Sequence, residues 1–178
     1  MAGLRAAGLL DRSVLVVYGD HYAVVDGPAP LARLLGFPGG SRYHEWLVRK
    51  KVPLLIRLPG EVGAGARRLT GGHLDIGPTL LGLLGITDQR TVMLGRDLTR
   101  GEDSLVVFRD GGFADGRHYV VTGVDPAAPE ICHEAATGRA IDCGPLEARR
   151  GEALTRLRVS DLIIRGDLLP ALAAAGGR

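Results

Sequence analysis

Three continuous apolar runs, each stopped abruptly by turn residues, most constrain the fold of this chain. They cover residues 13–18 (SVLVVY), 52–58 (VPLLIRL) and 104–108 (SLVVF). Unbroken runs rich in β-branched residues are typical of strands buried on both faces. Helical patterns lie between them at residues 31–35, 43–48 and 78–84, the last with Pro78 in its first turn. Strands that alternate with helices in this way predict an α/β sandwich with a mostly parallel sheet.

The end of the chain differs in character from this alternating part. Residues 117–122 and 131–143 predict antiparallel strands, with Thr137 and Gly138 at a hairpin turn. Apolar residues at helical spacing over residues 147–162 predict a helix that ends near Gly166. We therefore divide the chain into residues 1–112, the α/β core, and residues 113–178, an antiparallel hairpin and terminal helix packed on it.

Composition excludes several classes of protein. The 178 residues are 46% hydrophobic, which is typical of a globular domain and not of a disordered chain. The 22 basic and 20 acidic residues are scattered and leave a net charge of +2, so we expect no nucleic-acid partner. We find no uncharged apolar stretch of about 18 residues and no export signal, and expect a cytoplasmic location if the chain stands alone.

The sharpest chemical signal is the Gly19-Asp20-His21 turn directly after the first apolar run. In parallel α/β sheets, ligands bind beyond the carboxyl ends of the strands. A neighbouring carboxylate and imidazole offer the oxygen and nitrogen donors that suit Mn²⁺ or Zn²⁺. Gly19 would allow the sharp turn that brings both side chains to one ion. The alternative interpretation is a helix-capping aspartate beside a surface histidine.

The segment GLLDRSVLVVYGDHY around this turn resembles the strand and metal-binding turn of the alkaline phosphatase/sulfatase superfamily, in particular its lipoteichoic acid synthase-like branch. The order then continues with the segments VPLLIRLPG, GGHLDIGPTLLGLLGI, MLGRDL, VVFRDGGF and VSDLIIRGDLL. This series is similar to the carboxyl-terminal portion of those enzymes and covers nearly the whole chain. The resemblance implies the α/β sandwich of that superfamily.

The resemblance also implies a chemistry. Asp20 and His21 would complete a divalent metal site, Mn²⁺ above all, with Mg²⁺, Zn²⁺ or Ca²⁺ as alternatives. A metal-activated Thr, Ser or formylglycine would attack a phosphoester or sulfoester, and the closest branch transfers glycerol phosphate from a lipid.

The family nucleophile lies upstream of the region that this chain resembles, so we assign no catalytic residue here. We expect a carboxyl-terminal part that is inactive without its amino-terminal half, and that works on the extracytoplasmic face of the membrane when joined to it. Two alternatives stay open: a non-catalytic remnant or binding module of the same fold, and a relative that hydrolyses sulfuric esters or transfers phosphoethanolamine.

Further candidates are weaker. His73 and Arg109 are candidates for contact with substrate, although a structural role of His73 and an exposed ion pair at Arg109 and Asp110 are simpler explanations. Asp75 or Thr79 would cap the helix after His73. Packing roles are favoured for His44 and Trp46 on the predicted helix at residues 43–48.

Two cysteines, Cys132 and Cys143, flank the predicted hairpin turn symmetrically. They would face each other across the strands and form a disulfide if they occupy a non-hydrogen-bonded pair. Free thiols or a metal pair are the alternatives, and the extracytoplasmic setting of the family favours the disulfide. Because a parallel sheet that is cut partway exposes a strand edge and an apolar face, we also expect self-association.

Overall fold

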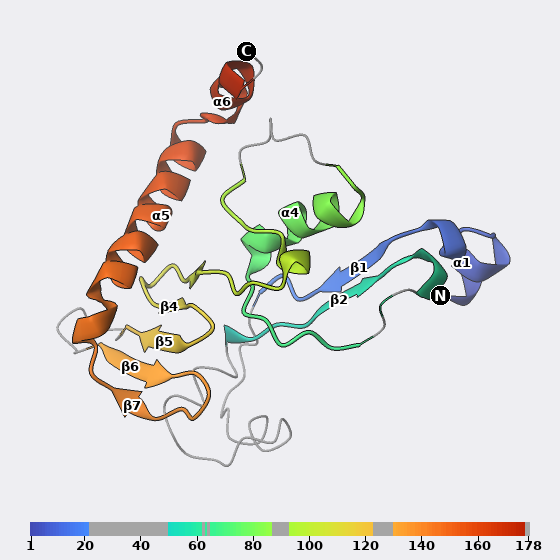
Figure 1. Ribbon diagram of the computed structural model, residues 1–178. Helices are drawn as coiled ribbons and strands as arrows, with labels where there is room; N and C mark the ends of the chain where they lie inside the picture. The colour runs from blue at the N-terminus through green and yellow to red at the C-terminus, as the bar shows by residue number, and fades with distance from the viewer. Residues whose placement is uncertain (22–49, 62, 64, 87–92, 123–129, 177–178) are drawn as a thin grey trace. The chain divides into compact units, whose positions relative to one another are not determined.

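The computed structural model describes residues 1–21, 50–61, 63, 65–86, 93–122 and 130–176 (Figure 1). The chain divides into two compact units. Unit 1 is Met1–Arg67 and unit 2 is Arg68–Arg178. The chain divides into these units between residues 67 and 68, and the predicted division after residue 112 stays a prediction. The helices expected at residues 31–35 and 43–48, with His44 and Trp46, lie outside the described residues.

Unit 1 is built around a pair of strands, β1 (Leu15–Tyr18) and β2 (Leu54–Arg57), which pair with Leu15 opposite Arg57 and Tyr18 opposite Leu54. Helix α1 (Ala2–Ala6) and the short helical turn η1 (Leu10–Arg12) precede them, and the turn η2 (Pro59–Glu61) follows. The side chain of Leu10 is buried. Arg57 Nη1 donates a hydrogen bond of 2.8 Å to the Leu10 carbonyl, so η1 is fastened to the end of β2.

The expected mostly parallel sheet is wrong for the strands that the structure describes, because every pair among them is antiparallel. An unbroken apolar run indicates a strand but carries no information on the direction of its partner. The burial expected on both faces is also incomplete, since Val17 of β1 and Leu55 of β2, directly opposite each other, are each 60% exposed. The α/β character of the chain stands, and the parallel arrangement does not.

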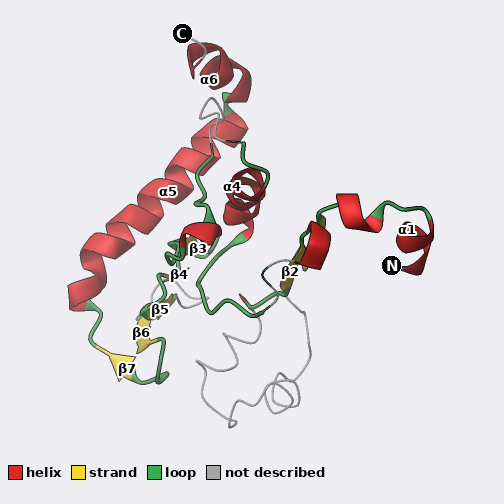
Figure 2. Ribbon diagram, turned by 45° about the vertical axis from the view of Figure 1, so that its right-hand side comes forward, coloured by secondary structure: helices red, strands yellow, loops and turns green. Residues whose placement is uncertain are grey.

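Unit 2 holds a five-stranded sheet in the order β3-β4-β5-β6-β7 (Figure 2). The strands are β3 (Val106–Val107), β4 (Phe113–Ala114), β5 (His118–Val121), β6 (Ile131–Glu134) and β7 (Ala140–Ile141). The antiparallel strands predicted in the last third of the chain are confirmed. Strands β3 and β4 lie on either side of residue 112 and pair with each other, so they belong to one sheet.

Helix α5 (Glu147–Arg165) packs on this sheet and closes the core of unit 2. It begins after the turn η4 (Gly144–Leu146), and Gly166 follows its last residue, as predicted. The buried cluster joins α5 and η4 to the strands through six residues, which are Leu105, Phe113, Val120, Cys132, Leu146 and Ala153. The fully buried Ala153 lets the helix backbone approach the sheet closely.

Two further helices complete the described part of unit 2, α4 (His73–Leu83) and α6 (Leu169–Gly176), with the turn η3 (Leu98–Arg100) between α4 and β3. The sequence placed the start of α4 at Pro78, five residues too late. Pro78 lies inside the helix, where its missing N–H removes one intrahelical hydrogen bond. Among the described helices, none combines the length and the apolar character that crossing a bilayer requires.

Candidate functional site

Asp20 and His21 stand on the turn that leaves β1, and both side chains point into solvent. Their side chains are 85% and 72% exposed, and Asp20 Oδ1 lies 3.7 Å from His21 Nε2. The Gly19 N–H donates a hydrogen bond of 3.0 Å to the Pro53 carbonyl and so ties the turn to the start of β2. The two predicted metal ligands therefore lie close together on a loop that is held by the Gly19–Pro53 hydrogen bond.

Gly19 serves this turn by its small size. Its φ lies outside the left-handed region, so the turn does not depend on a backbone conformation that only glycine favours. A Cβ atom at this position would lie 2.9 Å from Cβ of Val52 and 3.3 Å from Cδ of Pro53. Glycine is required because the turn passes directly against the segment that leads into β2.

The separation of the two donor atoms fits a shared divalent cation. Nitrogen and oxygen ligands lie about 2.0–2.2 Å from a bound Zn²⁺, so two ligands of one ion can be separated by up to about 4.4 Å. The 3.7 Å between Asp20 Oδ1 and His21 Nε2 lies within this limit. Within the described ranges, no three His, Cys, Asp or Glu side chains gather into a metal-binding group. Asp20 and His21 are thus two donors of a set that needs more.

His73 is the first residue of α4 and its exposed side chain lines an apolar groove. We call this the α4–α5 groove; its volume is about 370 Å³. It is lined from α4, from the segment before η3, from α5 and from α6 by His73, Leu74, Gly77, Pro78, Met93, Leu94, Ser160, Ile163, Ile164 and Leu169. No lining residue carries a permanent charge, so this surface does not favour a phosphate group, and substrate binding by His73 stays a prediction.

Arg109 follows β3 and is engaged by α5. Its Nη1 and Nη2 atoms lie 2.6 Å and 3.4 Å from the two carboxylate oxygens of Asp161. The hydrogen bond to Asp161 and the charge of that carboxylate raise the pKa of Arg109, and the same hydrogen bond lowers the pKa of Asp161. Arg109 thus forms an exposed ion pair, with Asp161 as its partner, and Asp110 Oδ1 accepts the Gly112 N–H at 2.9 Å. Arg109 therefore links the β3–β4 turn to α5.

Asp75 is a buried carboxylate of unit 2 for which the sequence predicted only a helix-capping role. It is 2% exposed, and its Oδ2 accepts the Gly72 N–H at 2.7 Å, which confirms the capping role. Its Oδ1 also accepts the Arg96 N–H at 2.7 Å and the Ser104 hydroxyl at 3.0 Å. One carboxylate thus joins the start of α4 to two segments 21 and 29 residues further along the chain.

The segment before η3 is packed tightly along α4. Thr79 does not cap the helix; its Oγ1 accepts the Leu98 N–H at 3.0 Å. Gly95 lies so close to α4 that a Cβ atom there would collide with the Leu74 carbonyl. In an unbroken helix that carbonyl would accept from residue 78, which is proline and has no N–H. The MLGRDL segment (residues 93–98) therefore packs against α4 and stabilises it.

A second polar cluster, absent from the sequence-based candidates, lies at the β4–β5 turn. Asp115 accepts the backbone N–H groups of His118 and Arg117 at 2.7 Å and 3.0 Å. Its carboxylate also lies 3.3 Å from His118 Nδ1 and 3.6 Å from Arg149 Nε on α5. Burial raises the pKa of Asp115, but the hydrogen bonds from His118 and Arg117 outweigh burial and leave the pKa below its usual value. The sequence signal that could have indicated this cluster is the Asp115-Gly116 pair, because aspartate before glycine is typical of a turn.

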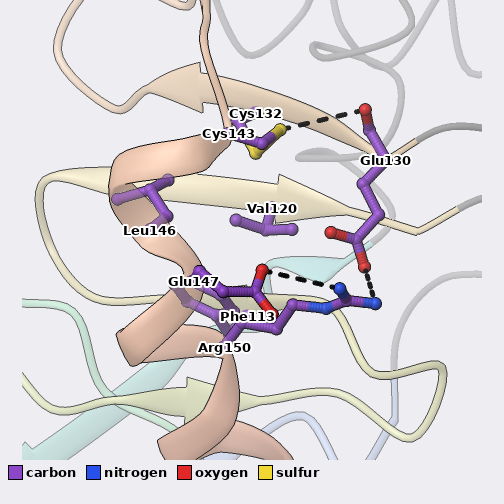
Figure 3. Close-up of a pocket in the computed structure, with 8 residues that line it drawn as sticks. All are labelled: Phe113, Val120, Glu130, Cys132, Cys143, Leu146, Glu147 and Arg150. Atoms are coloured by element: carbon purple, nitrogen blue, oxygen red, sulfur yellow. Dashed lines mark hydrogen bonds and ion pairs between the residues drawn. A yellow bond between two sulfur atoms is a disulfide. The ribbon is translucent and has the colours of Figure 1, made fainter.

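Cys132 and Cys143 form a disulfide, with their Cα atoms 5.4 Å apart. The register differs from the symmetric one expected, because Cys132 lies opposite Ile141 and Cys143 lies beyond the end of β7. The hairpin loop spans residues 135–139, with Gly138 in the left-handed region. The disulfide therefore crosses diagonally from β6 to the residue that precedes η4 (Figure 3).

The space beside this disulfide is too small to be a ligand site. Figure 3 shows the residues that line the cavity between the sheet and the start of α5. The volume of this cavity is about 10 Å³. This is close to the minimum that holds one water molecule. Arg150 lies across it, 2.7 Å from Glu130 and 3.7 Å from Glu147. These residues attach α5 to the sheet.

Comparison with known proteins places the chain in a family. Residues 1–86 match the Sulfatase family model. The chain is 33% identical over 172 residues to lipoteichoic acid synthase 1 of Bacillus subtilis (strain 168) and 30% identical over 174 residues to lipoteichoic acid synthase of Staphylococcus aureus (strain USA300). Each alignment covers 93% of this chain and 25% of the relative. The chain therefore spans about a quarter of the length of these curated relatives.

The family match contains the Asp20-His21 turn and α4, and the similarity to the two synthases extends over both units. The chain belongs to the alkaline phosphatase/sulfatase superfamily and is lipoteichoic acid synthase-like.

Proposed function

We propose that this chain is the carboxyl-terminal part of a metal-dependent, sulfatase-like transferase that acts on phosphoesters and transfers glycerol phosphate. The observation that supports it most is the exposed Asp20-His21 pair, whose donor atoms lie 3.7 Å apart on a turn within the Sulfatase match. The similarity to two lipoteichoic acid synthases supports a lipid-linked glycerol-phosphate substrate over a sulfate ester.

In this proposal Asp20 and His21 supply one oxygen and one nitrogen ligand to Mn²⁺. When bound, the cation supplies charge that stabilises a phosphoryl group and lowers the pKa of a nucleophile. Asp20 and His21 hold their positions because the Gly19 N–H is bonded to the Pro53 carbonyl. The exposure of both side chains leaves them accessible to ligands from other polypeptide.

The remaining ligands and the nucleophile are proposed to come from polypeptide outside these 178 residues. A complete site, such as a structural zinc centre, has about four protein ligands. Two ligands alone bind a divalent ion weakly by comparison. We therefore expect weak Mn²⁺ binding and no turnover by the chain alone. Joined to its amino-terminal half, the enzyme is proposed to work on the extracytoplasmic face of the membrane.

Calorimetric titration of the full chain with Mn²⁺ tests the site. We expect weak binding by the unaltered chain and loss of that binding in Asp20→Ala and in His21→Ala. Asp11→Ala is the matched control, because Asp11 is an exposed carboxylate of the same unit whose charged partner is Arg57. Binding that survives Asp20→Ala, or that disappears equally in Asp11→Ala, would remove the assignment of the metal site.

A further inference from the structure

The α4–α5 groove is a feature of unit 2 that the proposed function does not explain. Its volume of about 370 Å³ lies within the range of ligand sites, yet its lining is apolar apart from His73 and Ser160. Two of the large side chains that line it are mostly exposed: Leu74 is 62% exposed and Ile164 is 73% exposed. Exposed apolar surface of this kind marks a contact surface for another molecule.

Apolar exposure also extends past the groove along the same elements. Leu84 follows the last turn of α4, Leu162 lies on α5, and Leu168 precedes α6; all three are exposed and none lines the groove. An acyl chain or a small ligand would cover the groove and leave these side chains in water. A polypeptide segment, in contrast, can cover an apolar groove between helices together with the side chains on its rim.

The comparisons indicate which polypeptide is available. The alignments cover 93% of this chain but only 25% of each relative. In those proteins, the remaining three quarters of the polypeptide accompanies the matching region. The Sulfatase match itself reaches residue 86 and therefore includes the whole of α4. The uncovered face of α4 thus belongs to a family region that the relatives embed in a much longer protein.

We propose that the α4–α5 groove seats an apolar segment from the remaining part of the sulfatase-type enzyme. This inference rests on the proposed function, in which the chain is one part of that enzyme. The partner segment is uncharged at its centre, because the groove presents no charged side chain. In this proposal, unit 2 stabilises the association of this chain with the rest of the enzyme.

A chimera tests this contact. The full 178-residue chain replaces the segment that it matches in lipoteichoic acid synthase 1 of Bacillus subtilis, and Ile164→Cys is introduced into both the chimera and the chain alone. The measurement is the rate of maleimide labelling without reductant, so that the Cys132–Cys143 disulfide stays closed. Thr155→Cys is the control, because Thr155 is an exposed residue of the same helix outside the groove.

We expect the chimera to slow labelling at residue 164 roughly tenfold or more, since labelling of a covered site requires local opening. Labelling at residue 155 should change little. Equal labelling of residue 164 in both proteins would overturn the proposal, as would protection already present in the chain alone. A chimera that fails to melt cooperatively, although the chain alone does, would also count against it.

Two further readouts separate this proposal from the proposed function. Ile164→Glu should lower the melting temperature of the chimera and leave that of the chain alone unchanged. If residue 164 is protected but Mn²⁺ binding by the chimera survives Asp20→Ala, the metal assignment fails and the groove contact stands. If Mn²⁺ binding is lost but residue 164 labels freely, the reverse conclusion holds.

Discussion

Asp75 shows how much of unit 2 depends on one buried side chain. Its carboxylate is 2% exposed and accepts hydrogen bonds from Gly72, Arg96 and Ser104. Asp75→Ala leaves these donors unsatisfied, and we expect it to lower the free energy of unfolding by roughly 2–4 kcal/mol in urea titrations.

Glu102→Ala is the control for Asp75→Ala. Glu102 is an exposed carboxylate paired with Arg96 at 2.6 Å, and removal of such a pair costs about 0–1 kcal/mol. Similar losses of stability in the two variants would show that Asp75 does not bridge the segments.

Asp115 makes the stability of unit 2 sensitive to acid. Because its pKa in the folded chain is below the usual value, folding favours its ionised form. This contribution is fully present above the pKa of about 3.9 in the unfolded chain and is lost as the pH falls through the folded pKa. We expect melting temperatures to fall below about pH 4.

Asp115→Asn should flatten this acid dependence because the amide does not titrate. The same measurement on Asp11→Asn, a change of an exposed carboxylate in unit 1, provides the comparison. An acid limb in Asp115→Asn as steep as that of the unaltered chain would contradict this role. Glu152 and Asp161 also have lowered pKa values, from hydrogen bonds with Arg149 and Arg109, so they add to the residual slope.

Residue identities alone pointed to Asp20 and His21, since a carboxylate and an imidazole after a strand are a recognisable local pattern. They did not reveal the partner of Arg109, because Asp161 lies 52 residues away and only the packing of α5 brings it near. The Asp115 cluster was missed for the same reason, as Arg149 reaches it from another element.

At the scale of elements, the disulfide fastens the start of α5 to the sheet. It joins Cys132 of β6 to Cys143 just before η4, 11 residues apart. Closing a loop of this length stabilises the folded chain by about 3 kcal/mol in the chain-entropy model. We expect Cys132→Ala with Cys143→Ala to lower the free energy of unfolding by roughly this amount in urea.

Reduction of the unaltered chain should have the same effect as this double variant, and the reductant should leave the double variant unchanged. If the reductant destabilises both proteins equally, the loss does not arise from the disulfide. In the double variant, truncation of the buried Cys132 side chain also leaves a cavity beside Phe113 and Val120, and this cavity lowers the free energy of unfolding further.

Helix α5 and the β6–β7 hairpin were predictable as elements, since local periodicity and turn residues define them. The start of α4 was not, because Pro78 suggested a first turn. The helix instead begins at His73, where Asp75 bonds to Gly72 and the MLGRDL segment braces the exposed first turn. The register of the hairpin also escaped prediction, because its loop spans five residues that include Gly138 and the symmetric turn does not form.

At the scale of the whole molecule, uncovered apolar surface predicts association. Val17 and Leu55 lie opposite each other on a two-stranded sheet and are each 60% exposed, and isolated two-stranded sheets are marginally stable in water. We expect light scattering after size-exclusion chromatography to give a mass above the 18.8 kDa of the monomer.

Val17→Lys with Leu55→Glu should shift this distribution towards the monomer, because opposite charges across the strand pair keep the sheet paired while covering its face with polar groups. Thr155→Lys, a change on the exposed side of α5, is the control. A stable monomer of the unaltered chain would contradict the prediction and would show that the chain covers its own apolar surface.

The sequence by itself determined the family, the Asp20-His21 turn, α5 and the antiparallel character of the last strands. These features depend on residues close together in the chain, whose spacing reports local hydrogen bonding and which face is apolar. Only the tertiary structure decided the antiparallel pairing of β1 with β2, the Arg109–Asp161 ion pair and the three donors to Asp75. Each of these last contacts, apart from the Gly72 cap, joins residues that only folding brings within hydrogen-bonding distance.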